Sequence, residues 1–295
     1  VRRLCRSVRI ISFMSRERLA SAHMSMGDAM KPSKLYTRDY NYLLPEEKKK
    51  KEEYFRQITE IDILSIKPME YYPLAVRHNI SLFPNNHIEL LGMKDETSIA
   101  RLNADFLGLI DMDGCLERDV LNFINHTPAY HIVAGILKDR FPFGHHELYL
   151  FKEMCLGNDY RTDYVLIGKG SGGYEFVLIE FEKPDGRITI KDGHLGEAFR
   201  KGIYQAEDWK AWMDANFDTF CADLSSVKGE RDFPDELKKY DSTRFHYVVV
   251  AGRRDDFSET TYRTVREKRQ RLDIHLLHHD NLYDSAVKLE SDNTF

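Results

Sequence analysis

The spacing of apolar residues changes several times along the chain and predicts helices interleaved with strands. Helical spacing runs through 113–141, where a break at Pro128 predicts two helices, and returns in 194–220 as an amphipathic helix of about five turns. β-Branched and aromatic residues dominate 147–184 and 245–254, which predicts strands there. This interleaving predicts an α/β fold with a mixed central sheet flanked by helices.

Shorter and more charged segments lie toward both ends of the chain. After residue 254 the pattern predicts a charged helix near 258–272, a short strand at 274–277 and a closing helix from Asp280. The run PEEKKKKEEYFRQ at 45–57 predicts a solvated helix or a linker. Short alternating runs broken by Pro and Asn-Asn predict a small strand-rich region within 60–110.

A shift in composition near Asp111 divides the chain into three parts. We expect 41–110 to be a smaller α+β accessory domain and 111–290 to be the main domain. Residues 1–40 are rich in Arg and Ser and superficially match a mitochondrial presequence. Because the chain starts on Val and offers later methionines such as Met14, we favour a spurious translated extension or a disordered tail for this part.

Bulk composition excludes some classes of protein but selects none. The chain has 295 residues, 42% of them hydrophobic, which suffices for a packed core, and its net charge of −5 shows no overall basic excess for nucleic-acid binding. The four cysteines include no C-x-x-C pair, which argues against a zinc site or disulfide framework and favours the cytoplasm. No apolar run approaches the roughly 18 to 20 residues of a membrane span, so no membrane partner is expected.

The stretch GKGSGG at 168–173 satisfies the dinucleotide-binding pattern G-x-G-x-x-G. That pattern requires a helix after the glycines, whose N-terminal amides receive the phosphates. Here the chain continues as YEFVLI, a strong strand, and contains no Gly-Lys-Ser/Thr for a Walker loop. We therefore predict a hairpin turn between antiparallel strands, with glycine supplying positive φ angles.

The predicted hairpin brings acidic residues together at its open end. With the turn centred near Gly170, Asp163 lies opposite 178–180, and side-chain alternation puts Glu180 and Glu182 on one face. Three carboxylates therefore converge. The other face of the second strand is predicted to be core and consists of Val177, Ile179 and Phe181.

Converging carboxylates repel one another and lose hydration unless a cation neutralises them. A divalent metal would do so, and oxygen-only ligands with the Phe181 carbonyl between the two glutamates suit Mg²⁺ or Mn²⁺ better than zinc. The alternative is an exposed pair of acids neutralised by Lys or Arg. Spacing alone leaves both open.

The order of these motifs resembles a known nuclease superfamily. An acid at the start of a hairpin, an apolar strand ending in Glu-x-(Lys/Glu) and a following helix with Gln resemble the PD-(D/E)xK nucleases. More closely, about half the chain, from Phe141 to Ala286, resembles the nuclease domain of Shedu, a bacterial anti-phage defence family. The matching segments in chain order are YRTDYVLIGKG, VLIEFEKPDG, YQAEDWKAWM, YVVVAGRR and HHDNLYDSA.

The resemblance implies a restriction-endonuclease-like core and a catalytic site. Asp163 would be the first acid and Glu180 the second, both metal ligands, with Glu182 as a further ligand. Glu182 stands where most of the superfamily has Lys, so either Glu182 or Lys183 would position or deprotonate the attacking water. Gln205 would lie against the site from the neighbouring helix, as in the RecB-like branch.

Other residues carry weaker expectations. Glu153 is a candidate for an additional acid. Arg253 and Arg254, at the end of a strand, and Lys169, in the glycine loop, are candidates for contacts with DNA phosphates; for the arginines, surface salt bridges are the alternative.

Histidine-rich and tryptophan-containing segments have simpler interpretations. GHHE at 144–147 and HLLHHD at 275–280 lack H-E-x-x-H spacing, so we predict loop or hydrogen-bonding roles and no zinc site. Trp209 and Trp212 are predicted to be core residues and not platforms for base stacking.

Together these features predict a Mg²⁺- or Mn²⁺-dependent deoxyribonuclease, an endonuclease acting on phosphodiester bonds in bacterial defence against phage or foreign DNA. The accessory domain would sense DNA or control assembly, and the resemblance implies a homo-oligomer, with tetramers among the expected forms. Two other classes stay open. One is a catalytically degenerate nuclease fold that only binds DNA or protein, suggested by Glu182 at the Lys position; the other is a structural oligomerisation protein.

Overall fold

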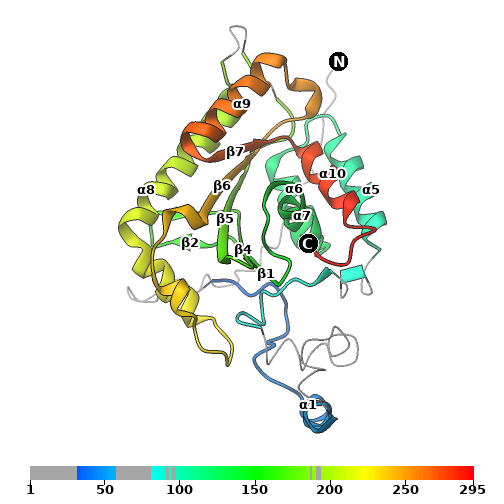
Figure 1. The fold of residues 1–295 in the computed structure, drawn as a ribbon. Coiled ribbons are helices and arrows are strands. Elements are labelled where there is room, and N and C mark those ends of the chain that lie inside the picture. The colour runs from blue at the N-terminus through cyan, green and yellow to red at the C-terminus, as the bar shows by residue number, and fades with distance from the viewer. Residues whose placement is uncertain (1–31, 58–80, 91–92, 95–97, 187, 191–193) are drawn as a thin grey trace, which may run out of the picture.

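The computed structural model describes residues 32–57, 81–90, 93–94, 98–186, 188–190 and 194–295. Its centre is a five-stranded sheet in the order β1-β4-β5-β6-β7, with β1, β4 and β5 antiparallel and β5, β6 and β7 parallel (Figure 1). The predicted mixed sheet is confirmed. The strands are β1 (Glu147–Lys152), β4 (Tyr164–Gly170), β5 (Gly173–Phe181), β6 (Phe245–Val250) and β7 (Ile274–Leu277), with a separate pair β2 (Cys155–Leu156) and β3 (Tyr160–Arg161).

Helices cover both faces of the sheet and divide its core into two clusters. On β5, Val177, Ile179 and Phe181 belong to one cluster, as predicted, while Leu178 belongs to the other. Both faces of β5 are therefore buried. The first cluster packs under α5 (Ile99–Ile110), α6 (Glu117–His126), α7 (Tyr130–Arg140) and α10 (His279–Lys288), and the second under α8 (Glu197–Ser226) and α9 (Glu259–Leu272), as Figure 1 shows.

The glycine loop joins β4 to β5 as an antiparallel hairpin. Gly170 pairs with Gly173, which leaves Ser171 and Gly172 in the turn, and Gly173 has a φ of +101°. The predicted hairpin is thus confirmed, because a strand follows the glycines where a phosphate-binding loop requires a helix.

Most of the predicted helices and strands are confirmed, including α1 (Pro45–Gln57), the break between α6 and α7, and β7. The exception in length is α8, which has 30 residues and continues to Ser226. Asn216 has non-helical φ and ψ of −131° and 22°, and its side-chain amide donates to the Trp212 carbonyl at 3.0 Å. In a regular helix the Asn216 backbone N–H would bond that carbonyl, so the side chain compensates for the irregularity.

The region predicted to be strand-rich differs from expectation where the structure describes it. Residues 99–110 form helix α5, because Ile99, Leu102, Phe106 and Ile110 recur on one face and are buried. That part of the prediction is wrong. His87 forms a single bridge to Tyr149 of β1, and residues 58–80 lie outside the described residues.

Segments before Asp111 share the core of the main domain. Ile88 and α5 belong to the first hydrophobic cluster, and so does Leu35, which falls in the predicted extension 1–40. The Leu35 backbone N–H donates to the Asn85 carbonyl at 3.0 Å. Residues 1–31 lie outside the described residues, and the division of the chain near Asp111 stays a prediction. Every helix in the described ranges is too short or too polar to span a bilayer.

Close packing of α8 on β6 makes Gly202 a sensitive position. A Cβ atom there would lie 2.4 Å from Cγ1 of Val249, a stiff β-branched side chain. We expect Gly202→Ala to lower the free energy of unfolding by about 1–3 kcal/mol through overpacking, although alanine normally stabilises a helix over glycine by about 1 kcal/mol. Gly108→Ala in α5 is the control, because nothing lies within 4 Å of its Cβ position. Urea unfolding measures both variants, and equal stabilisation would contradict the close contact.

Candidate functional site

Asp163, Glu180 and Glu182 lie at the open end of the β4–β5 hairpin. Asp163 directly precedes β4, and its Oδ2 atom accepts a hydrogen bond of 2.7 Å from the Phe181 backbone N–H. Glu180 is the penultimate residue of β5, and Glu182 follows the strand. The charges of Asp163 and Glu182 both raise the pKa of Glu180, so the structure places the three acids that the hairpin was predicted to join near one another.

Burial sets the protonation of this cluster. It raises the pKa of Glu180 from 4.5 to about 9, and the charges of Asp163 and Glu182 raise it further. Burial likewise raises the pKa of Asp163 to about 7, against the opposing effect of the Phe181 N–H. Glu180 is 5% exposed, and its carboxylate has no hydrogen bond or ion pair with any described residue. Without a cation, the Asp163–Glu180 pair therefore retains a proton at neutral pH.

Two charged residues outside the predicted motifs complete the cluster. Lys201, in the first turns of α8, forms an ion pair with Glu182, with 2.8 Å between Nζ and Oε1. Glu117, the first residue of α6, adds negative charge that raises the pKa of Asp163 and Glu180. Both come from helices docked onto the hairpin from elsewhere in the chain, so no local pattern in the sequence identifies them.

A cleft opens beside the cluster. It has a volume of about 450 Å³ and is bounded by the loop after β5, the start of α8 and the loop after β6. Glu182 and Lys201 both line it, together with Lys183, Asp185 and Gly252. The ion pair of Glu182 and Lys201 is thus accessible to a ligand in the cleft.

The chemistry of the cluster suits a hard divalent cation. Carboxylate and carbonyl oxygens are the preferred ligands of Mg²⁺ and Mn²⁺, and the buried charge of Asp163 and Glu180 lacks a compensating cation at hydrogen-bonding distance among the described residues. In the same ranges, no group of three or more His, Cys, Asp or Glu side chains could hold a metal ion as it stands. By donor type and charge, the residues fit a metal.

The other predicted site residues lie around this cluster. Gln205, one turn beyond Lys201 on α8, has a buried Oε1 atom without a partner among the described residues. Lys183 is exposed, and its Cε atom lies 3.0 Å from the Cβ position of Gly186, so the side chain follows the loop. Glu153 is also exposed, while its backbone N–H donates to the Asp163 carbonyl at 2.8 Å.

Lys169 lies at the opposite end of the hairpin. It is six residues from Asp163 along an extended strand, a span of about 20 Å. Its Nζ atom is 3.7 Å from Glu147 and 5.1 Å from the centre of the Tyr174 ring. A DNA contact by Lys169 stays a prediction, at a place separate from the three acids.

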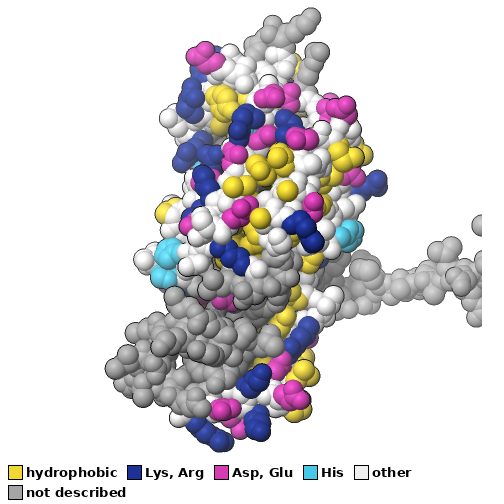
Figure 2. Space-filling model, turned by 90° about the vertical axis from the view of Figure 1, so that its right-hand side faces the viewer, with side chains coloured by type: hydrophobic (Ala, Val, Ile, Leu, Met, Phe, Trp, Pro, Cys, Tyr) yellow, Lys and Arg dark blue, Asp and Glu magenta, His cyan; other side chains and the backbone are white. Residues whose placement is uncertain are grey.

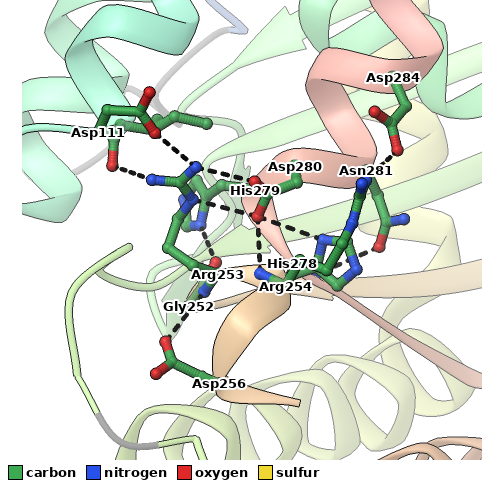
Figure 3. A network of polar contacts seen from close by, with 11 residues as sticks. Asp111, Gly252, Arg253, Arg254, Asp256, His278, His279, Asp280, Asn281 and Asp284 are labelled. Atoms are coloured by element: carbon green, nitrogen blue, oxygen red, sulfur yellow. Dashed lines mark hydrogen bonds and ion pairs between the residues drawn. The ribbon is translucent and has the colours of Figure 1, made fainter.

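Arg253 joins three elements of the fold (Figure 3). Its guanidinium donates to both oxygens of Asp280 at 3.1 and 2.8 Å, to Asp111 at 2.7 Å and to the Ile110 carbonyl. These bonds tie the end of α5 and the start of α10 to the loop after β6. Arg254 pairs with α10, and its backbone N–H donates to Asp280 at 2.7 Å. The salt-bridge alternative therefore describes both arginines, and their contact with DNA stays a prediction.

Histidines and tryptophans take the simpler roles predicted for them. Nδ1 of His279 is 3.0 Å from the Gly252 carbonyl, and the rings of His145 and His146 lie 4.3 Å apart in a loop. Trp209 is fully buried and Trp212 is 7% exposed, so both are core residues as predicted.

Comparison with known proteins places this site within a family. The chain has no match among curated proteins. The family model described as Shedu protein SduA, C-terminal, matches residues 115–283, which is more than half of the chain. The matched range contains the hairpin, α8 and the loop that carries Arg253. The chain therefore belongs to the Shedu family, with the C-terminal domain of SduA as the matching part.

Proposed function

We propose that the protein is a metal-dependent DNA nuclease with a restriction-endonuclease-like core of the PD-(D/E)xK type, acting in defence against phage. The observation that carries this proposal is the buried Asp163–Glu180 pair, whose pKa values are raised to about 7 and about 9. A pair of uncompensated buried acids destabilises a fold, and such perturbed groups beside a cleft are typical of functional sites. Membership of the Shedu family supports the role in anti-phage defence.

Asp163 and Glu180 would hold Mg²⁺ or Mn²⁺ through their carboxylate oxygens. When bound, such an ion lowers the pKa of a coordinated water and polarises the phosphodiester. The Phe181 N–H holds Oδ2 of Asp163, which orients this carboxylate and leaves Oδ1 as its free oxygen. Burial of Glu180 excludes bulk water from the ligand, which strengthens its attraction for a cation.

Lys201, which lies on α8 and not on β5, would fill the role of the lysine in the PD-(D/E)xK motif. Although burial opposes its charged form, the bond to Glu182 gives Lys201 a raised pKa, so the amine stays protonated. It would therefore act as a cation that orients the phosphate. Glu182, whose pKa is raised by burial, would accept the proton of the attacking water.

A degenerate nuclease fold that only binds DNA is the second candidate. Glu182 at the usual Lys position favours it, as does the lack, in the described part of the chain, of side chains that could hold a metal as they stand. This candidate predicts salt-sensitive DNA binding with no cleavage under any metal. An oligomeric assembly and a DNA-sensing N-terminal region remain compatible with both candidates.

The experiment that tests the proposal incubates the full chain with linear duplex, nicked and single-stranded DNA. We expect cleavage with Mg²⁺ or Mn²⁺ and none with EDTA, because the Asp163–Glu180 pair needs a cation to function. Gel electrophoresis of labelled substrates measures the products. DNA binding without cleavage in every metal and substrate combination would support the degenerate fold and refute the nuclease.

The two lysines near Glu182 can be distinguished by matched substitutions. We expect Lys201→Met to lower the cleavage rate by about 10²-fold or more, the usual effect of removing a group that acts in proton transfer or charge stabilisation. Lys183→Met should change the rate by no more than a few fold, since Lys183 follows the exposed loop and makes no ion pair with a described residue. Single-turnover rates with saturating Mn²⁺ measure both variants. The reverse order of effects would assign the lysine role to Lys183.

A further inference from the structure

A groove lies between α8 and α9, next to the cleft of the acidic cluster. Its volume is about 630 Å³. Ile190 lines both the groove and the cleft beside Glu182, so the two hollows adjoin. The hydroxyls of Thr189 and Thr261 share a hydrogen bond, which fastens Thr189, and with it the neighbouring Ile190, to α9. A ligand lying in the groove would therefore point toward the Glu182–Lys201 pair.

Each wall of the groove is one stripe of a helix. Arg200, Tyr204 and Glu207 on α8 are spaced by three or four residues and share one face of that helix. Arg263 and Lys268 lie on the facing stripe of α9, which runs from residue 260 to 268 over about 12 Å. Helix geometry thus fixes where the residues of both walls lie along the groove.

The basic side chains near the groove have no polar partner among the described residues. The five basic residues of α9 form no ion pair or hydrogen bond through their side chains with any described residue, and Arg200 is equally free. Among the described residues that line the groove, Glu207 and Glu267 are the only acidic ones. Figure 2 shows a contrasting face, the right-hand side of Figure 1 with α5 and α10, where basic and acidic side chains are interspersed. Unpaired cations on α9 therefore favour an anionic ligand over a structural role.

An exposed aromatic ring lies among these cations. The Tyr204 side chain is 65% exposed on α8, although an aromatic ring of this size is usually buried. In single-stranded nucleic acids, unpaired bases stack on such rings while Arg and Lys bind the phosphates. In a duplex the bases are already stacked on one another and cannot reach Tyr204.

We propose that the groove between α8 and α9 binds single-stranded DNA, with phosphates on Arg200, Arg263 and Lys268 and a base stacked on Tyr204. The strand continues past Ile190 into the cleft of Glu182 and Lys201. This inference rests on the proposed nuclease function for its biological meaning, while its physical basis is the groove itself. It assigns DNA contact to residues other than Arg253, Arg254 and Lys169.

Binding without metal tests the groove independently of cleavage. Fluorescence anisotropy with a labelled oligothymidylate of about 20 nucleotides is measured in EDTA over a series of salt concentrations. Arg263→Ala combined with Lys268→Ala should weaken binding and lower the salt slope, log Kd against log salt, by about 1.4, or 0.7 for each lost phosphate contact. Arg266→Ala combined with Arg269→Ala removes the same charge from α9 outside the groove and should leave the slope nearly unchanged.

Tyr204 provides the test for single strands. Tyr204→Ala should weaken binding of the single strand about tenfold, while Tyr204→Phe keeps the ring and should bind like the wild type. Equal loss in both α9 double variants, or duplex binding as tight as single-strand binding with no effect of Tyr204→Ala, would overturn the inference. Groove-dependent binding in EDTA without cleavage in Mn²⁺ would support the groove and reject the nuclease, so the two failures are distinguishable. Melting temperatures confirm that each variant is folded.

Discussion

Asp163→Asn and Glu180→Gln are each expected to reduce metal-dependent DNA cleavage by at least about 10²-fold, the range for removing one preorganised electrostatic group from an active site. Both substitutions keep the size of the side chain but remove the charge that would bind the cation. Asp163→Asn also retains an oxygen that can accept the Phe181 N–H bond, so the hairpin should stay intact. Single-turnover cleavage of a labelled substrate measures the loss.

Glu175→Gln is the matched control for these two variants. Glu175 lies on the same strand as Glu180 but toward the turn, where it pairs with His246 at 2.7 Å. Because it faces no member of the acidic cluster, its substitution should leave the cleavage rate within a few fold of the wild type. If all three variants cleave equally, the site assigned to Asp163 and Glu180 is wrong.

The second large effect concerns stability and pH. Glu180 has a pKa of about 9 in the folded protein and 4.5 as an ordinary side chain, and Asp163 has about 7 against 3.8. The folded state therefore holds protons that the unfolded chain releases. Their stabilising contribution is complete below about pH 4 and is lost as the pH rises toward 7 and then 9. We expect the metal-free protein to lose on the order of 6 kcal/mol of unfolding free energy between about pH 5 and pH 8, because each bound proton changes it by about 1.4 kcal/mol per pH unit.

Glu180→Gln should remove most of this pH dependence and stabilise the metal-free protein near pH 8, since a neutral amide replaces an acid that the fold keeps from ionising. Mn²⁺ should also stabilise the wild type near pH 8, because it binds the ionised carboxylates of the folded protein. At a concentration of about 100 times Kd it would add about 2.7 kcal/mol near pH 8, and much less near pH 5, where protons compete for the carboxylates. Urea unfolding with and without Mn²⁺ measures these changes. An equal response of Glu180→Gln to Mn²⁺ would show that the metal binds elsewhere.

The loss of activity and the gain of stability are expected in the same variant. A loss of activity together with a gain of stability is typical of a functional site, where charged groups that activity requires lower the stability of the fold. A structural acid pair would behave differently, because removing one partner of a satisfied pair destabilises the protein. Comparing the two measurements on Glu180→Gln therefore separates a functional from a structural role for the cluster.

Local patterns were enough to predict the hairpin and its acids. Glycines followed at once by a strand specify a turn, and the two-residue period of β5 places Glu180 and Glu182 on one face opposite Asp163. Helix periodicity likewise identified α6, α7 and α9. These predictions succeeded because turn chemistry and side-chain alternation act over a few neighbouring residues. Helix α5 was not predicted. The predicted strand-rich region was continued from the alternating runs before residue 99 through 99–110, although the apolar residues there recur at helical spacing.

The contacts between distant segments were decided by the tertiary structure. The ion pair of Lys201 with Glu182, the charge of Glu117 beside Asp163 and the adjoining groove between α8 and α9 depend on how helices dock onto the sheet. Arg253 meets Asp111 across 142 residues, which no spacing in the sequence records. By itself the sequence determined which elements form and which carboxylates share a strand end, because those depend on local periodicity. Only the packed fold decided which charges neutralise one another, since that depends on burial and on distances between elements far apart in the chain.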